Sequence, residues 1–321
     1  MVDIKKVAEF LNKHDFYRIL CHQNPDGDTI GSAFALKRML EMLGKTANVC
    51  CSDAFPPQYD YMTRVENSPE ADYNTLVTVD IADTSLFGKK YEDLKNSVDL
   101  NIDHHASNSN YANISFVDSS SAANCEIIYK LSLELGIKLD SYLADCIYTG
   151  LTTDTGCFRY ASVTAYTHLA AMGAINAGAH HSEINRSMFE TKSLARINTE
   201  QLVIGSLEMY FESRCAVMML TREMLEKTGA KEDELEGTAS LPREIEGVLV
   251  GALFREKPDG TIKVSVRTNA PIDASRLCLN FGGGGHKAAA GCSFSCDINE
   301  AKVKFLAEVE KILDERNFSN R

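Results

Sequence analysis

Short apolar runs alternate with stretches of helical periodicity along the first part of the chain. Strands are predicted for four runs rich in β-branched and other apolar residues, at 16–21, 47–51, 76–80 and 98–103. Apolar residues at helical spacing predict helices at 30–43, 122–135, 142–152 and 163–177. This alternation is typical of an α/β fold, and we expect a mostly parallel, doubly wound sheet.

The pattern changes after about Ser187. Residues 191–210 are predicted to be a linker with a helix at 194–205, and strand-like runs follow at 216–220, 247–255 and 262–267. The sequence Pro258-Asp259-Gly260 predicts a hairpin between the last two runs, and a helix is expected at 299–315. We therefore expect domains at 1–190 and 211–321, the second a smaller α/β domain.

Composition and charge narrow the range of functions. The 321 residues are 44% hydrophobic, enough for real cores, and no apolar run is long enough to span a membrane. The segment 1–14 predicts an amphipathic helix without a secretory core, and the ten cysteines form no CxxC pair, so a cytoplasmic protein with free thiols is expected. A net charge of −12 opposes binding to long duplex nucleic acid, so a nucleic-acid substrate should be short.

Residues that can bind metals cluster where the predicted strands end. A turn after the first strand holds His22, Asp26 and Asp28, with Gly27 expected to let the backbone fold tightly between the acids. Asp80 ends the third predicted strand, His104 follows the fourth, and Asp154 follows a helix. The carboxyl ends of parallel strands share one edge, where ligands bind. Taken singly, the first group also fits a helix-capping aspartate, and His104-His105 also fits a buried hydrogen-bonded pair.

Two imidazoles and four carboxylates are too many ligands for one ion and suit two. A carboxylate shared by both, expected to be Asp80, would hold two metals roughly 3.5–4 Å apart. Such a pair activates a bridging hydroxide and neutralises charge on a phosphate under attack. Mixed histidine and aspartate ligation favours manganese, with magnesium or cobalt as alternatives, and the lack of cysteine ligands argues against structural zinc.

These motifs, in their order, resemble those of the DHH phosphoesterases. The resemblance rests on His22-Gln-Asn-Pro-Asp26-Gly-Asp28, Asp80, Asp103-His104-His105 and Asp154. The run Phe281-Gly-Gly-Gly-Gly-His286-Lys287-Ala-Ala-Ala-Gly291 resembles the signature of the DHH-associated C-terminal domain. The length fits the compact group of oligoribonucleases (nano-RNases) and 3′-phosphoadenosine 5′-phosphate (PAP) phosphatases.

The resemblance assigns roles position by position. It implies that His22, Asp26 and Asp80 hold one ion, and that Asp28, Asp80, His104 and Asp154 hold the other. It places His105 beside the scissile phosphate, with Asp103 orienting the histidines, and it implies an active cleft between the domains. Arg267 would bind a terminal phosphate. An anion nest, otherwise a flexible linker, is expected from the substrate-binding residues Gly283, Gly284, Gly285, His286 and Lys287.

The resulting hypothesis is a manganese-dependent phosphoesterase that cleaves very short oligonucleotides to mononucleotides. Removal of the 3′-phosphate from PAP, giving AMP, would use the same site. A phosphodiesterase for cyclic or linear dinucleotides is the alternative, and a catalytically inactive nucleotide sensor is the competing hypothesis from another class. The partners expected are short oligonucleotides or nucleotide phosphates, with no membrane. The oligomeric state stays open, a homodimer through the N-terminal domain being the family's frequent arrangement.

Overall fold

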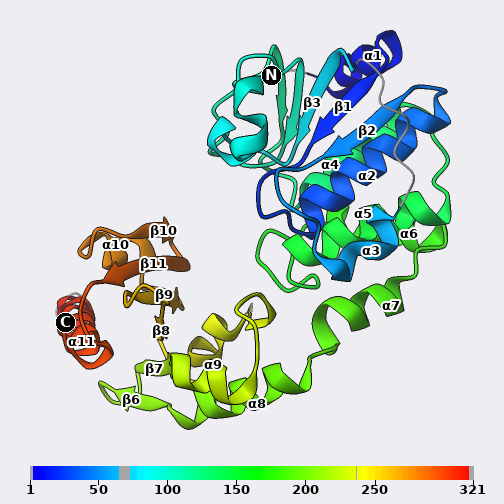
Figure 1. Cartoon of the computed structure of the whole chain (residues 1–321). Helices are drawn as coiled ribbons and strands as arrows, with labels where there is room; N and C mark the ends of the chain where they lie inside the picture. The colour runs from blue at the N-terminus through cyan, green and yellow to red at the C-terminus, as the bar shows by residue number, and fades with distance from the viewer. Residues whose placement is uncertain (1–2, 65–72, 236, 318–321) are drawn as a thin grey trace. The chain divides into compact units, whose positions relative to one another are not determined.

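A computed structural model describes residues 3–64, 73–235 and 237–317 (Figure 1). The chain divides into two compact units, unit 1 up to Thr191 and unit 2 from Lys192 onward. Each unit has its own sheet and its own hydrophobic core, so each is described by itself.

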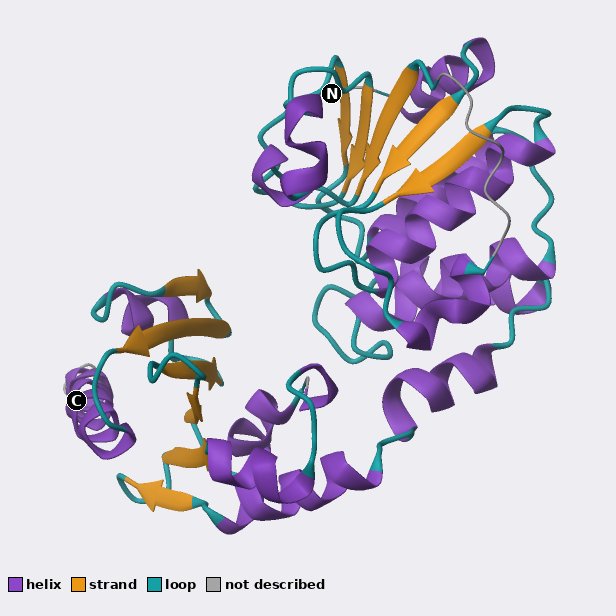
Figure 2. Cartoon of the chain, viewed as in Figure 1, coloured by secondary structure: helices purple, strands orange, loops and turns teal. Residues whose placement is uncertain are grey.

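Unit 1 is built on a five-stranded sheet in which every neighbouring pair is parallel. Its strands are β1 (Tyr17–Leu20), β2 (Ala47–Cys50), β3 (Thr75–Val79), β4 (Leu100–Asp103) and β5 (Ile114–Val117), in the order β2-β1-β3-β4-β5. Figure 2 shows the five arrows pointing to the same edge of the sheet. The predicted parallel α/β fold is confirmed. The sequence analysis missed β5, an edge strand whose four residues are all only half-buried.

Both faces of this sheet are covered, one thickly and one thinly. The thick cover comprises α1 (Ile4–Lys13), α2 (Gly27–Met42), α3 (Asp60–Thr63), α4 (Asn124–Glu134), α5 (Ser141–Asp154), α6 (Ala165–Asn176) and α7 (His181–Asn185). These helices share a core with Ile19, Val77 and Val79. On the other face the 3₁₀-helices η2 (Thr84–Phe87) and η3 (Lys89–Leu94) pack against Leu20 and Leu76.

The strand order places a topological switch between β1 and β3. From β1 the chain passes to β2 on one side, and it then returns to β3 on the other side of β1. In open parallel sheets, ligands bind at the carboxyl ends of the two strands that flank such a reversal. The residues that directly follow β1 and β3 are therefore the ones best placed to form a site.

Unit 2 contains a six-stranded mixed sheet in the order β10-β11-β9-β8-β7-β6. The strands are β6 (Glu208–Tyr210), β7 (Cys215–Leu220), β8 (Val250–Glu256), β9 (Ile262–Thr268), β10 (Gly284–His286) and β11 (Ala289–Phe294). Only β7 and β8 run parallel among these described neighbours. The predicted Pro258-Asp259-Gly260 turn joins β8 and β9 as an antiparallel hairpin.

The two faces of the second sheet differ in how far they are covered. On one face α10 (Ala274–Leu279) and α11 (Ile298–Asn317) pack against β7, β8, β9 and β11. On the other face α8 (Leu194–Gly205), α9 (Arg222–Thr228) and η6 (Thr238–Glu244) form a small core around Met218 and Leu253. Among the described residues, that small core draws on no residue of β9, β10 or β11.

The predicted helix at 194–205 is α8, and its Val203 is part of the small core of unit 2. Of the helices that the structure describes, none has the length and apolar character needed to cross a bilayer.

Candidate metal centre

His22 and Asp26 lie together directly after β1. The Nδ1 atom of His22 is 2.8 Å from the carbonyl oxygen of Gln23, and because a carbonyl can only accept, Nδ1 carries the proton. In the neutral ring, the lone pair of Nε2 then faces Asp26 Oδ1 at 3.7 Å and Asp80 Oδ2 at 3.9 Å. These distances are too long for hydrogen bonds, and an unprotonated nitrogen beside two carboxylates is the arrangement of a cation-binding site.

Helix α2 begins earlier than the sequence predicted, so Gly27 and Asp28 belong to its first turn. Asp26 is the N-cap, and its Oδ1 accepts hydrogen bonds from the amides of Asp28 and Thr29 at 3.0 and 3.1 Å. The capping interpretation and the ligand interpretation of Asp26 are therefore compatible.

The explanation of Gly27 as a tight-turn residue was wrong. A Cβ atom at this position would lie 2.5 Å from Thr153 Oγ1, so the glycine lets α2 approach α5 closely.

Asp28 is almost fully buried and is held by the start of α4. Its Oδ1 accepts a 2.9 Å hydrogen bond from the amide of Cys125, and its Oδ2 accepts one from the amide of Asn124. These two orphan donors of a helix N-terminus stabilise a carboxylate and fix its orientation. They compensate part of the negative charge of Asp28, and the same carboxylate still faces His104.

Asp80 follows β3 and lies at the centre of the cluster. Its side chain is 3% exposed, and its backbone adopts a left-handed conformation with φ of 57°. Oδ2 faces His22 at 3.9 Å, whereas Oδ1 faces His104 at 3.5 Å. Among the described residues Oδ1 has no hydrogen-bond partner. A buried carboxylate oxygen without a partner is costly unless a cation binds it, so Asp80 fits a metal ligand.

His104 joins Asp28, Asp80 and Asp154 in a second ligand group. Its Nδ1 lies 3.2 Å from the carbonyl oxygen of Ser121 and so carries the proton. Its Nε2 is 3.5 Å from Asp80, 3.6 Å from Asp154 and 3.9 Å from Asp28. Asp154 is the last residue of α5, a helix predicted to end two residues earlier.

The six predicted ligand residues thus form two neighbouring groups of three. One consists of His22, Asp26 and Asp80, and the other of Asp28, His104 and Asp154; within each group the ligand atoms lie within 4.8 Å of one another. A further group of the same kind combines Asp80, His104 and His105.

Negative charge accumulates in this cluster and perturbs its carboxyl groups. Burial, reinforced by repulsion from Asp28 and Asp26, raises the pKa of Asp80 well above its usual range. Burial and repulsion from Asp28 raise the pKa of Asp154 to about 7. A divalent cation bound among these carboxyl groups would offset their mutual repulsion and favour the ionised forms.

Asp103 and His105 form a separate hydrogen-bonded pair beside the ligands. Asp103 is fully buried, and its Oδ1 accepts from the amide of His104 and from Nδ1 of His105, both at 2.8 Å. The hydrogen bond that His105 donates to Asp103, opposed by partial burial, raises the pKa of His105. The His105 side chain is 45% exposed, so it can still meet a molecule in solution.

A buried polar network that the sequence analysis did not find supports this pair. The side-chain amide of Asn108 donates to Asp103 Oδ2 and, at 2.9 Å, to Asn101 Oδ1. The side-chain amide of Asn101 lies 3.2 Å from the carbonyl of Ile81, the residue that follows Asp80. A sequence signal was present, because polar Asn101 stands in the middle of an apolar strand. The backbone contacts of Ser121, Asn124 and Cys125 have no such signal, since any residue supplies them.

The predicted substrate-binding residues all lie in unit 2, around one end of β9. Strand register places Arg267 opposite Ala289, and Ala289 opposite His286, so these three side chains share one face of the sheet. This is the face on which the small core stops short of β9.

The glycine run is not a loop throughout, because Gly284, Gly285 and His286 form the edge strand β10. The amide of Gly283 already donates to the carbonyl of Cys278 at 2.9 Å, so it cannot bind an anion in this arrangement. A Cβ at Gly283 would lie 2.1 Å from the carbonyl oxygen of Gly291, which gives this glycine a packing role.

Comparisons with known proteins show which family the chain belongs to. Residues 17–151 match the model of the DHH family, N-terminal domain, and residues 213–315 match that of the DHHA1 domain. A Thermus thermophilus protein described as a bifunctional oligoribonuclease and PAP phosphatase NrnA is 31% identical over 303 residues, covering 92% of this chain and 89% of that protein. The chain belongs to the DHH family. The family expected from the motifs is therefore confirmed.

Other members of the DHH family are similar over most of their length. A Bacillus subtilis protein with the same description is 27% identical, with 92% of this chain and 93% of that protein covered. The crystal structure of an exopolyphosphatase-related protein from Bacteroides fragilis matches with a TM-score of 0.87 at 25% identity, covering 96% and 95% of the two chains. RecJ from Thermus thermophilus, in complex with Mn²⁺, shares the fold at a TM-score of 0.53 and 17% identity, and this chain covers 55% of it.

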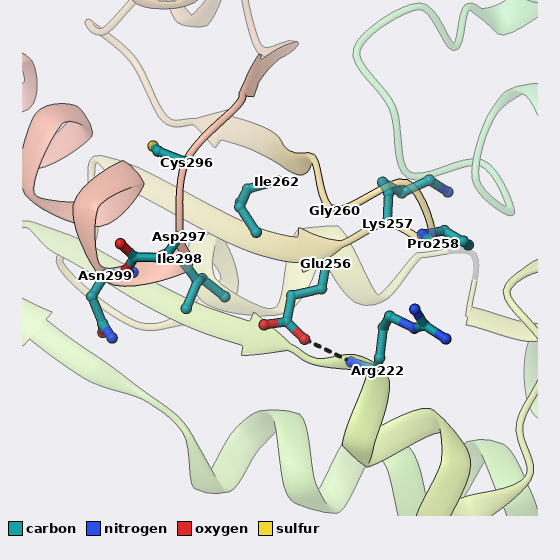
Figure 3. A pocket seen from close by; sticks show the side chains of 10 residues that line it. All are labelled: Arg222, Glu256, Lys257, Pro258, Gly260, Ile262, Cys296, Asp297, Ile298 and Asn299. Atoms are coloured by element: carbon teal, nitrogen blue, oxygen red, sulfur yellow. Dashed lines mark hydrogen bonds between the residues drawn. The ribbon is translucent and has the colours of Figure 1, made fainter.

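A cavity of about 410 Å³ in unit 2 lies away from the predicted site residues. Figure 3 shows it beside the β8–β9 hairpin, at the opposite end of β9 from Arg267. Its lining carries charges of both signs, with Arg222 and Lys257 beside Glu256 and Asp297, and the backbone amide of Arg222 donates to Glu256 at 2.9 Å. The cavity therefore presents no charge of one sign to a nucleotide.

Proposed function

We propose that this DHH protein is a manganese-dependent phosphoesterase that hydrolyses very short oligonucleotides to mononucleotides and PAP to AMP. One observation carries the proposal: the two oxygens of buried Asp80 face two different ligand groups, Oδ2 toward His22 and Oδ1 toward His104. A carboxylate with this orientation suits a bridge between two ions. The choice of substrates follows the relatives, which are described as bifunctional oligoribonucleases and PAP phosphatases.

The ligand residues divide between two ions. We assign His22, Asp26 and Asp80 to one, and Asp28, Asp80, His104 and Asp154 to the other. Two divalent ions bound there would polarise a phosphoryl oxygen and make a nucleophile available from water near neutral pH. Histidine nitrogens mixed with carboxylates favour manganese over magnesium, which prefers oxygen ligands.

His105 and Asp103 have a different task from the ligands. The carboxylate of Asp103 fixes the proton on Nδ1 of His105 and stabilises the imidazolium form. A positively charged, partly exposed His105 would donate a hydrogen bond to an oxygen of the scissile phosphate and stabilise charge that develops there. Asp103 would act by orienting His105, without touching the substrate.

Unit 2 supplies the groups that would bind the rest of the nucleotide. Small Ala289 lies between Arg267 and His286 in the cross-strand row, so a phosphate could approach both side chains on the face that they share. The guanidinium of Arg267 suits a terminal phosphate. Exposed Lys287 would add a positive charge next to His286.

A substrate panel with manganese present tests the proposal. We expect the highest kcat/KM values for RNA dimers to tetramers and for PAP, and values at least about tenfold lower for cyclic di-adenylate and pyrophosphate. Asp80→Asn should abolish turnover, whereas the control Asp83→Asn, at an exposed cap of η2, should leave it intact. Preference for cyclic di-adenylate would support the dinucleotide phosphodiesterase instead, and nucleotide binding without turnover would support a sensor.

A further inference from the structure

The segment 118–125, which follows β5 and includes the first two residues of α4, contacts two residues of the same ligand group. The carbonyl oxygen of Ser121 accepts the Nδ1 hydrogen bond of His104, and the amides of Asn124 and Cys125 donate to Asp28. All three contacts use backbone atoms, so the position of this segment sets the orientation of both His104 and Asp28. We call it the ligand-orienting segment.

Lys130, on α4, contacts two residues of the ligand-orienting segment through its ammonium group. Its ammonium nitrogen lies 2.8 Å from Asp118 Oδ2 and 2.8 Å from Ser121 Oγ, and 3.3 Å from Glu126 Oε1. The three protons of the ammonium group match these three acceptors. The ring of Tyr166, 4.8 Å from the same nitrogen, covers the group, whose side chain is 23% exposed.

The contacts made by Lys130 hold the segment at its first residue and at its middle. The Ser121 hydroxyl, which contacts Lys130, also donates to Asp118 at 2.9 Å, while the Ser121 carbonyl orients His104. Buried Glu126, just after the segment, accepts from the amide of Ala122 at 3.3 Å and from Thr167 Oγ1 at 2.8 Å. Without Lys130, the negative charges of Asp118 and Glu126 would face each other across the segment with no compensating cation.

The ion pairs of Lys130 are partly buried, unlike salt bridges at the protein surface. Glu126 is 1% exposed, so removal of its cation would leave a buried charge. Hydrogen bonds from Lys130, Ser120 and Ser121 outweigh burial and hold the pKa of Asp118 well below its usual range. These hydrogen bonds therefore hold the segment in place at neutral pH.

We propose that Lys130 is a positioning residue for the ion assigned to Asp28, His104 and Asp154. It acts through Ser121 and the start of α4, and it touches neither ion nor substrate. The proposal rests on the two-ion site of the proposed function. Groups that hydrogen-bond metal ligands directly typically contribute about 10–100-fold to metal affinity; Lys130 fixes one such group, Ser121, so we expect an effect of the same order when Lys130 is lost.

The test is manganese titration of the metal-free full-length chain by calorimetry, without substrate. Lys130→Met keeps the length of the side chain and removes its charge; Lys130→Arg keeps the charge. We expect two binding steps in the wild type, one of them weakened 10–100-fold in Lys130→Met and largely restored in Lys130→Arg. Lys138→Met, at an exposed lysine of the same unit, is the matched control and should bind as the wild type does.

Each outcome decides a separate question. A folded Lys130→Met protein that binds both ions with wild-type affinity overturns the proposal, even if its Tm is lower, because a purely structural role would change only the Tm. If Lys130→Met does not fold, the double variant Glu126→Gln/Lys130→Met, which leaves no buried unpaired charge at Glu126, is decisive by the same criterion. If the wild type itself binds no manganese, the proposed function is wrong, and the proposal for Lys130, which rests on it, is wrong as well.

Discussion

Replacement of Asp103 by asparagine should separate the orienting role of this residue from the metal-binding role of its neighbours. The carboxylate accepts three hydrogen bonds: from the amide of His104, from Nδ1 of His105 and from the side-chain amide of Asn108. Asparagine has one acceptor oxygen and one donor nitrogen. The side chain of Asn108 cannot turn round to accept, because its nitrogen also donates to Asn101. The side-chain nitrogen of the new asparagine must therefore face another donor, either Asn108 on one side or the His104 amide and His105 on the other.

The size of the effect follows from the bond that is lost. A hydrogen bond between charged groups contributes about 1.5–3 kcal/mol. If the His105 imidazolium is needed mainly in the transition state, kcat should fall about 10–150-fold while KM changes little. Asp99→Asn is the matched control. Asp99 directly precedes β4, at the end of the strand opposite to the ligands, and its carboxylate accepts a hydrogen bond from the backbone amide of Leu76.

Steady-state kinetics with a dinucleotide substrate and saturating manganese would measure this effect. The carboxylate raises the pKa of His105, so its loss should lower that pKa and move the alkaline limb of the kcat/KM profile to lower pH. Manganese affinity should stay close to that of the wild type, since Asp103 is not an assigned ligand. Wild-type kcat in Asp103→Asn, or an equal loss in Asp99→Asn, would refute the reasoning.

Further predictions concern the metals, the packing and unit 2. Chelation should abolish activity and lower the Tm, and manganese should restore both; an unchanged Tm would contradict a metal-filled core. The pKa of Asp154 is raised to about 7, so protons compete with the metal for this carboxylate below pH 7. The apparent manganese affinity should therefore rise up to about tenfold per pH unit between pH 5 and 7 and then level off. An affinity that calorimetry finds to be independent of pH would argue against ligation by Asp154. Gly150→Ala would place a Cβ 2.2 Å from Cys125 Sγ and should lower the free energy of unfolding by about 1–3 kcal/mol in urea titrations, whereas Gly205→Ala, with nothing within 4 Å, should not. Arg267→Met should raise KM for oligonucleotides about 10-fold or more with little change in metal binding, and Arg267→Lys should recover only part of the loss; an unchanged KM would remove Arg267 from the substrate site.

Strands buried on both faces were predictable because hydrophobic burial leaves a direct trace in the sequence. The apolar run that contains β3 has all five strand residues buried, and its bounds differ from the prediction by one residue. Edge strands leave a weaker trace. β5 is a four-residue strand interrupted by Ser115, with only half-buried residues, and β10 consists of two glycines and His286, so neither shows a long buried apolar run.

The ligand residues were predictable because their chemistry resides in side chains at strand ends. What the sequence could not give is the way each ligand is held. Asp28 is oriented by backbone amides at the start of α4, almost a hundred residues later, and Gly27 is required by Thr153 on another helix. Such contacts depend on tertiary packing, which no local pattern encodes. Lys130 would have been assigned to a solvated helix face on its sequence alone.

The backbone and burial of Asp80 have a consequence for any effort to evolve or engineer this protein. A left-handed aspartate and an unpartnered buried oxygen are both unfavourable in the metal-free fold, the first by about 1–3 kcal/mol. Glycine at this position would relieve the strain, and asparagine would remove the charge. Selection for thermal resistance in the presence of a chelator should therefore enrich variants that have lost Asp80, and with it the activity. Only a screen that supplies metal, or that scores turnover, would keep stability and function linked.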